Sequence, residues 1–162
     1  DRLEIRSASP ADFPAIQSIY ARARGFMAER GNPGQWGTHF PPEDLLRADI
    51  EEGRLYVVEA GRRVHGVFAF IVGSDETYAV IEDGGWLSGG TYGTIHRVAS
   101  DGEVPGIFGS VVSFCWGKKN HLRIDTHEKN AVMRHLIEKN GFLRCGIIHV
   151  ADGTPRIAYE RI

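Results

Sequence analysis

The sequence has few cysteines, no excess of charge of one sign and no long apolar run, and each shortage excludes a class of protein. Only Cys115 and Cys145 occur among 162 residues, which excludes a disulfide scaffold and favours reduced thiols in a cytoplasmic protein. The formal net charge of −2 provides no basic stripe for nucleic acid. No apolar run approaches the roughly 20 residues that cross a bilayer. The sequence therefore predicts a cytoplasmic protein that binds neither nucleic acid nor membrane.

What the sequence does contain is typical of one globular domain. Its residues are 42% hydrophobic and 25% charged, and a chain of this length can bury a sizeable core. There is no internal repeat, low-complexity tract or linker. The polar start, DRLEIRSAS, predicts a first strand rather than a signal peptide. We therefore expect a single domain over residues 1–162.

Hydrophobic periodicity and breaker residues divide the chain into strands and helices. The predicted order is β-α-α-β-β-β-α-β-α-β-β, which indicates an α+β fold with a strand–helix–strand crossover in its second half. The expected strands are residues 3–8, 54–59, 64–72, 94–100, 122–126, 142–150 and 156–162, and the expected helices follow Ser9, span 43–52 and 106–118, and follow Asn130.

Residues 122–148 carry the clearest signal of function. A short strand ends in polar residues, an amphipathic helix follows, and Asn140-Gly141 ends that helix. Polar groups at the carboxyl end of a strand can hold an extended polar ligand. The unit resembles motif B of the GNAT acyltransferases, which reads roughly Asn-x-x-(small)-x-x-x-(Tyr)-x-x-x-Gly-Phe. The residues on the named positions are Asn130, Met133, Ile137, Gly141 and Phe142.

The predicted order of elements is also that of the GNAT fold, so the resemblance covers most of the chain. It implies a mixed, twisted sheet of about six to seven strands, flanked by about four helices and splayed between the fourth and fifth strands. It also implies acetyl-CoA as the acyl donor and no metal. An unrelated α+β fold is the alternative, and it would lack the splay.

The pyrophosphate loop of the family, motif A, is only partly kept. Its pattern Gln/Arg-x-x-Gly-x-Gly/Ala falls on residues 103–108, where Gly106 is kept but Glu103 and Phe108 replace the first and last residues. A glycine-rich turn before a core helix is the alternative interpretation, although the first N–H groups of a helix can hold an anion. Glu103 would repel a pyrophosphate unless it pointed to solvent. The cofactor-binding residues that the resemblance implies are Arg97, Val98, Ala99, Gly102, Glu103, Val104, Gly106, Ile107, Phe108, Gly109, Ser110, Asn130 and Met133.

Acetyl transfer to an amine needs a base, an oxyanion donor and a leaving thiolate. His96 and His127 are the candidate bases, because imidazole titrates near neutrality. Strand alternation places Thr94, His96 and Val98 on one face, which leaves open whether His96 faces the cleft or packs under a helix. A backbone N–H near Val98 would meet the oxyanion. Ile137 stands where the family often carries a tyrosine acid, so that role is vacant or filled from elsewhere.

The loops supply further candidates. Asp125 is interpreted equally well as a turn residue or as an orienting carboxylate, and Glu82 and Asp83 lie in the long segment 73–93. Aromatic residues in the loops suit a cationic amine, although tryptophans also anchor loops to a core. The substrate-binding candidates are Trp36, Trp86 and Tyr92.

Two functions fit these residues. The first is an N-acetyltransferase in which a small-molecule or peptide amine attacks acetyl-CoA directly in a ternary complex. Cys145, which follows Gly141-Phe142, is placed poorly for a covalent route. The second is a non-catalytic acyl-CoA-binding or regulatory module, favoured by the weakened motif A and the missing tyrosine. The sequence does not identify the acceptor or the oligomeric state, although exposed sheet edges of this fold could pair in a homodimer.

Overall fold

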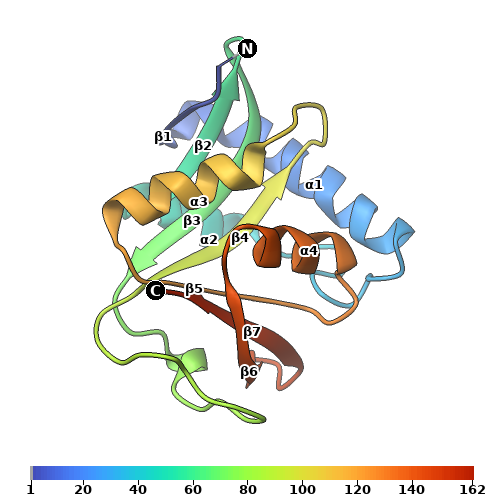
Figure 1. Ribbon diagram of the computed structural model, residues 1–162. Helices are drawn as coiled ribbons and strands as arrows, with labels where there is room; N and C mark the ends of the chain where they lie inside the picture. Colours follow the sequence, from blue (N-terminus) through green and yellow to red (C-terminus); the bar gives the residue numbers. More distant parts are fainter. Residues whose placement is uncertain (1) are drawn as a thin grey trace.

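A computed structural model describes residues 2–162, and within them seven strands form one sheet in the order β1-β2-β3-β4-β5-β7-β6 (Figure 1). Neighbouring strands are antiparallel except β4 and β5, which are parallel. The elements are β1 (Glu4–Ser7), η1 (Pro10–Asp12), α1 (Phe13–Glu29), α2 (Glu43–Glu51), β2 (Leu55–Ala60), β3 (Arg63–Val72), η2 (Glu76–Tyr78), β4 (Gly93–Ser100), α3 (Ile107–Lys118), β5 (Leu122–Thr126), α4 (Ala131–Lys139), β6 (Leu143–His149) and β7 (Pro155–Arg161).

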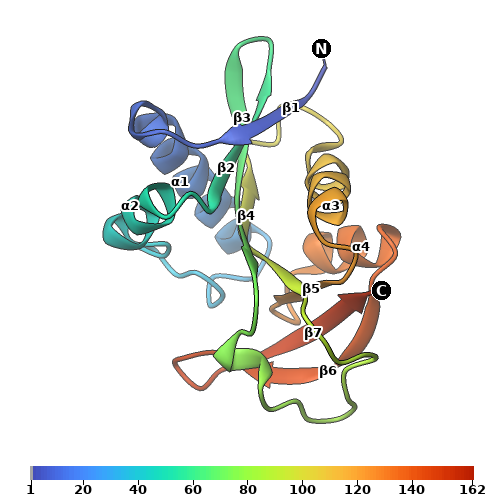
Figure 2. The same ribbon diagram turned by 90° about the vertical axis from the view of Figure 1, so that its left-hand side faces the viewer.

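Helices cover both faces of the sheet. Figure 2 shows α1 and α2 on one side and α3 and α4 on the other. Val58 and Phe68 pack toward α3 and α4, whereas Val57 and Val67 pack toward α1 and α2. The central strands are therefore buried on both faces, as expected for strands that alternate between two hydrophobic clusters. A smaller cluster lies under the segment between β3 and β4 and contains Tyr78, Tyr92, Ile148 and Ala158.

The sheet opens between β4 and β5. In the described part of the chain, these strands pair only at Gly93↔Leu122 and Thr94↔Arg123. Beyond that point β4 continues along β3 to Ser100, while β5 continues along β7 to Thr126. The edge of β4 that faces β5 therefore has no strand partner after its second residue, which confirms the predicted splay.

A bulge at Arg97 changes the side-chain alternation of β4. Arg97 has a φ of 52°, and the register between β3 and β4 shifts at this point. Ile95 and Val98 both pack in the cluster beneath α3, whereas Ala99 packs toward α1. The prediction that His96 shares a face with Val98 is therefore wrong, because the extra residue in the bulge interrupts the alternation of side chains along the strand.

The order of elements is otherwise as predicted, and most bounds agree within one or two residues. The first helix starts with the short turn η1, where the Asp12 carboxylate accepts a hydrogen bond from the Ser9 N–H at 2.8 Å. The long segment after β3 contains η2 and a bridge from Glu82 to Ile147 of β6. Among residues 2–162, no helix is both long and apolar enough to cross a membrane.

Candidate active site

An open cleft of about 340 Å³ lies beside the unpaired edge of β4, between the start of α3 and the inner face of α4. Its walls combine apolar side chains with backbone groups, which is the usual composition of a small-molecule site. Lys139 and Asn140, at the carboxyl end of α4, also line the cleft. The predicted cofactor residues that line it are Val98, Ala99, Val104, Gly106, Ile107, Phe108, Gly109 and Met133.

Two backbone features of the cleft suit an extended ligand that ends in an anion. The free edge of β4 offers N–H and C=O groups to a ligand that carries amides, in the way that a peptide adds to a sheet. At α3, Gly106 has a left-handed conformation with a φ of 82°, and the first helical hydrogen bond runs from the Ser110 N–H to the Gly106 carbonyl. The preceding N–H groups of α3 are therefore left for an anion.

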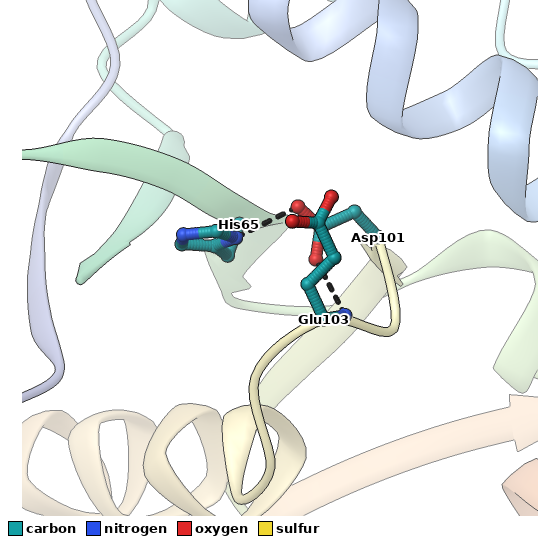
Figure 3. Close-up of side chains that lie close together, drawn as sticks. All are labelled: His65, Asp101 and Glu103. Atoms are coloured by element: carbon teal, nitrogen blue, oxygen red, sulfur yellow. Dashed lines mark hydrogen bonds and ion pairs between the residues drawn. The ribbon is translucent and has the colours of Figure 1, made fainter. Parts of the chain in front are cut away.

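The loop that leads from β4 into α3 is fixed at its first residues (Figure 3). The Asp101 carboxylate pairs with His65 Nδ1 of β3 at 2.7 Å and accepts a hydrogen bond from the Glu103 N–H at 3.0 Å. His65, Asp101 and Glu103 bring ligand atoms within 4.8 Å of one another, close enough to hold a metal ion. These groups already have partners in the chain, however, because Glu103 also pairs with Arg22 of α1 at 2.7 Å.

The remaining predicted cofactor residues, which include Gly102, Glu103 and Ser110, do not line the cleft. The Arg97 side chain pairs with Asp49 of α2 at 2.8 Å, on the opposite face of the sheet. Asn130 caps α4, where its Oδ1 accepts a hydrogen bond from the Met133 N–H at 3.1 Å. Its Nδ2 donates to Gln35 Oε1 at 3.1 Å. The structure thus shows Asn130 as a cap, and its contact with a cofactor stays a prediction.

A second group of polar side chains lies on the other face of β4 and β5. His96 Nε2 is 3.0 Å from Asp75 Oδ2, and the Tyr78 hydroxyl donates to Asp125 Oδ2 at 2.6 Å. The hydrogen bond with His96 holds the pKa of Asp75 well below its usual range. Burial raises the pKa of Asp125, and the hydrogen bond from Tyr78 opposes that rise. This group therefore combines one ionised carboxylate with one that burial disfavours as an anion.

Neither a protein-family model nor a curated protein sequence matches this chain. Among solved structures, an acetyltransferase of the GNAT family from Streptococcus agalactiae is 29% identical with a TM-score of 0.90, and the match covers 99% of this chain and 95% of that one. A GNAT-family acetyltransferase from Listeria monocytogenes is 18% identical with a TM-score of 0.70, and the match covers 98% of this chain and 94% of that one. The protein yncA from Salmonella typhimurium, whose structure holds its cofactor acetyl-CoA, is 18% identical with a TM-score of 0.63, and the match covers 99% of this chain and 93% of that one.

The chain belongs to the GNAT superfamily. In the segment predicted to be motif A, Glu103 stands on the position expected for a cation or an amide, and the structure shows how its charge is accommodated. Glu103 is exposed and forms an ion pair with Arg22 across the start of the loop. The negative charge that replaces the usual cation or amide is therefore compensated within the chain. Ile137, on the tyrosine position of motif B, is fully buried in the core.

The two predicted histidines of this GNAT chain have different surroundings. His127 lies just beyond β5, where its Nδ1 accepts a hydrogen bond from the Lys129 N–H at 3.1 Å. Burial lowers the pKa of His127, and the positive charge of Arg156 lowers it further. Within residues 2–162 it has no carboxylate partner within 4.0 Å, whereas His96 has Asp75. His96 is thus the candidate base that has an orienting group.

The aromatic residues predicted to bind the acceptor have partners in the chain. Trp86 and Tyr92 stack on the guanidinium of Arg123, each at 3.9 Å from ring centroid to Cζ, and Arg123 pairs with the buried Glu160 at 2.8 Å. The ring faces expected to meet a cationic amine therefore contact a cation of the protein itself. Trp36 packs against Tyr20 in the connection between α1 and α2.

The structure separates the two acidic candidates of the long loop from His96. Glu82 lies 3.7 Å from His149 at the outer strand β6, and Asp83 occupies a left-handed turn with a φ of 55°. The sequence reasoning missed Asp75 and Tyr78 as partners of the site. Asp75 caps η2 by accepting a hydrogen bond from the Thr77 N–H at 2.9 Å. That local signal predicts a turn, but the tertiary contact with His96 has no counterpart in the sequence pattern.

Proposed function

We propose that this GNAT protein is an N-acetyltransferase that moves an acetyl group from acetyl-CoA to an amine by direct attack in a ternary complex. One observation carries the proposal: the unpaired edge of β4 and the amino end of α3 meet in a single cleft. An extended, amide-bearing ligand with a pyrophosphate fits such a pair of features. The acetyl-CoA bound in yncA supports the choice of donor.

In this proposal the chain holds the donor mainly through its backbone. Val98 and Ala99 would pair with the pantetheine amides, and the loop around Gly106 would meet the pyrophosphate. Met133 and Leu136 of α4 would pack along the arm, since both line the cleft. Bound acetyl-CoA supplies an activated thioester: the amine would add to its carbonyl carbon and form the C–N bond, and the C–S bond would then break and release the CoA thiolate.

His96 is proposed to accept the proton that the ammonium must lose before it can attack. Asp75 orients the imidazole and stabilises the imidazolium that forms, because the two groups are already 3.0 Å apart. A backbone N–H of β4 near Val98 would stabilise the developing oxyanion. The leaving group departs as a thiolate, which needs little help from an acid, and the buried Ile137 is compatible with that.

Calorimetry with acetyl-CoA, followed by thiol release with a panel of amines, tests the proposal. We expect saturable binding of acetyl-CoA and release of CoA thiol that depends on an amine. Binding without turnover on any amine would instead support a non-catalytic acyl-CoA module. No binding of acetyl-CoA would exclude both. In the same assay His96→Gln should lower turnover, and His149→Gln is its matched control, since His149 is exposed on β6.

A further inference from the structure

We propose that Arg156 binds a carboxylate of the acceptor, so that the acceptor is an amine of the amino-acid or peptide class. The inference rests on the proposed acetyl transfer and names the class of its second substrate. Arg156 is the second residue of β7 and is only 6% exposed. Its guanidinium is therefore largely removed from water, and its partners determine what else it can hold.

Every hydrogen-bond partner of this guanidinium is a neutral oxygen. Nη1 donates to Thr154 Oγ1 at 3.0 Å and to the Pro155 carbonyl at 2.9 Å, and Nη2 donates to the Gln35 carbonyl at 3.3 Å. No carboxylate of residues 2–162 lies within 4.0 Å of it. A buried cation without a counter-ion is unfavourable. The protein thus supplies no counter-ion for Arg156, and an anionic ligand could supply one.

Other well-buried arginines of the sheet show the contrast. Arg97 pairs with Asp49 at 2.8 Å, and Arg123 pairs with Glu160 at 2.8 Å, both carboxylates being fully buried. The chain therefore provides a buried acid for each of these guanidinium groups but leaves Arg156 to neutral oxygens.

Arg156 has donors left over with which it could bind a carboxylate. A guanidinium carries five N–H donors, and the three contacts described above leave the Nε–H and one Nη2–H. In a guanidinium, the Nε–H and the Nη2–H next to it point from one edge of the planar group, and donors on that edge can bind both oxygens of a carboxylate. Lysine would offer a single ammonium in their place, so the site is specific for a planar fork.

Arg156 faces the same side of the sheet as the proposed base. Ile157 and Tyr159 of β7 pack beneath α3 and α4, so Arg156 points to the opposite face. On that face Ala158 of β7 pairs with Asp125, whose carboxylate feels the charges of both Arg156 and His96. A ligand with its carboxylate on Arg156 would therefore extend its amine toward the carboxyl end of β5 and His96.

The test compares acceptors that differ only in the carboxylate. CoA thiol release is measured with amino acids and dipeptides and with their C-terminal amides, and calorimetry measures binding of the N-acetylated acids and amides to the CoA-loaded protein. We expect the acids to be preferred, and the ratio of kcat/KM for acid over amide to fall at least about tenfold in Arg156→Gln. Arg156→Lys should keep the positive charge but recover only part of the ratio.

Arg2→Gln is the matched control, because Arg2 is exposed beside β1 at the other edge of the sheet. Its acid-to-amide ratio should equal that of the parent. An equal rate with acids and amides, or a preference that survives in both Arg156 variants with their acetyl-CoA affinity intact, would overturn the inference. No thiol release with any amine, together with Arg156-dependent binding of N-acetylated acids, would refute the proposed catalysis and leave the carboxylate site standing.

Discussion

The contact between His96 and Asp75 gives one histidine of this chain an orienting carboxylate at the splay of the sheet. The pKa of Asp75 is well below its usual range because of that hydrogen bond. Since the pKa is lowered on folding, the ionised carboxylate stabilises the native state at neutral pH. That stabilisation is lost as the pH falls below about 4, the pKa of an aspartate in the unfolded chain.

We expect Asp75→Asn to lower kcat/KM by about tenfold and to move the acid limb of its pH profile to lower pH. The reason is that the imidazolium of His96 loses the anion that stabilises it. The measurement is kcat/KM for thiol release between pH 5 and 9.

Asp83→Asn is the control for this prediction, because Asp83 lies in the same segment, is exposed and occupies a left-handed turn that asparagine tolerates. Its pH profile should match that of the parent. An unshifted acid limb in Asp75→Asn would remove Asp75 from the site.

The chemistry of the residue types identified the two histidines as candidate bases, but it did not predict which side chains contact them. His96 and His127 were candidates because of what imidazole can do at neutral pH. The choice between them depends on Asp75, which is 21 residues earlier and reaches His96 only after β3 and β4 have paired. Likewise, the aromatic residues Trp86 and Tyr92 gave no sign in the sequence that Arg123 would lie between them. Side-chain contacts across a sheet depend on register, which a single sequence specifies weakly.

At the scale of elements, side chains of α1 and α2 stabilise the bulge of β4. A residue other than glycine with a positive φ costs about 1–2 kcal/mol, and Arg97 has a φ of 52°. Its carbonyl accepts a hydrogen bond from the Tyr20 hydroxyl at 2.7 Å, and its side chain pairs with the buried Asp49, which also binds Arg54 at 2.7 Å. These contacts fix the direction of Val98 in the cleft.

We expect Asp49→Asn to destabilise the protein by about 3 kcal/mol, because it leaves two guanidinium groups without their buried counter-ion. Acetyl-CoA affinity should also fall, since the bulge that directs Val98 is released. Urea unfolding and calorimetry measure the two effects. Tyr20→Phe removes a single hydrogen bond and should cost about 1 kcal/mol.

The comparison variant on the same helix is Asp44→Asn, at the exposed first turn of α2, where the loss should stay below about 1 kcal/mol. If Asp49→Asn is no less stable than Asp44→Asn, the ion pairs do not support the bulge.

The elements themselves were predictable, and the bulge was not. Apolar periodicity, the capping residues Ser9 and Asp12 and the stop at Asn140-Gly141 determine the order and most bounds. An arginine in a left-handed conformation leaves no local signal, because the conformation is imposed by Tyr20 and Asp49 from other elements. The alternation of side chains along a regular strand therefore could not predict which face of the sheet each β4 side chain occupies.

At the scale of the molecule, contacts outside the sheet connect its two halves. Gln35, between α1 and α2, accepts hydrogen bonds from Asn130 of the second half and from Asn32. Its carbonyl accepts a further hydrogen bond from Arg156 of β7. On the other side, Glu160 of β7 accepts a hydrogen bond from the Leu87 N–H in the segment before β4. The two halves are thus joined by hydrogen bonds from these two loops to β7 and to Asn130 at the start of α4.

We expect Asn130→Ala to lower the free energy of unfolding by about 1–2 kcal/mol, because the helix cap and the bond to Gln35 are both lost. If Asn130 also binds the donor, acetyl-CoA affinity falls by a similar free energy. Denaturant unfolding and calorimetry separate the two quantities.

Asn130→Asp distinguishes the contributions, because an aspartate can still cap α4 but cannot donate to Gln35. It should recover the part of the stability that belongs to the cap. Unchanged stability in Asn130→Ala would contradict the role in joining the halves, and an unchanged dissociation constant would remove Asn130 from the donor site.

Within the sheet, the pairing of β4 with β5 joins the two halves through only two residue pairs, Gly93↔Leu122 and Thr94↔Arg123. A donor laid along β4 would complete the interrupted ladder, so its binding would stiffen the molecule as well as fill the cleft. Slow amide hydrogen exchange along β4 would then report occupancy. We therefore expect ordered binding, in which the donor binds first and the acceptor second, and steady-state kinetics with both substrates varied would measure this order.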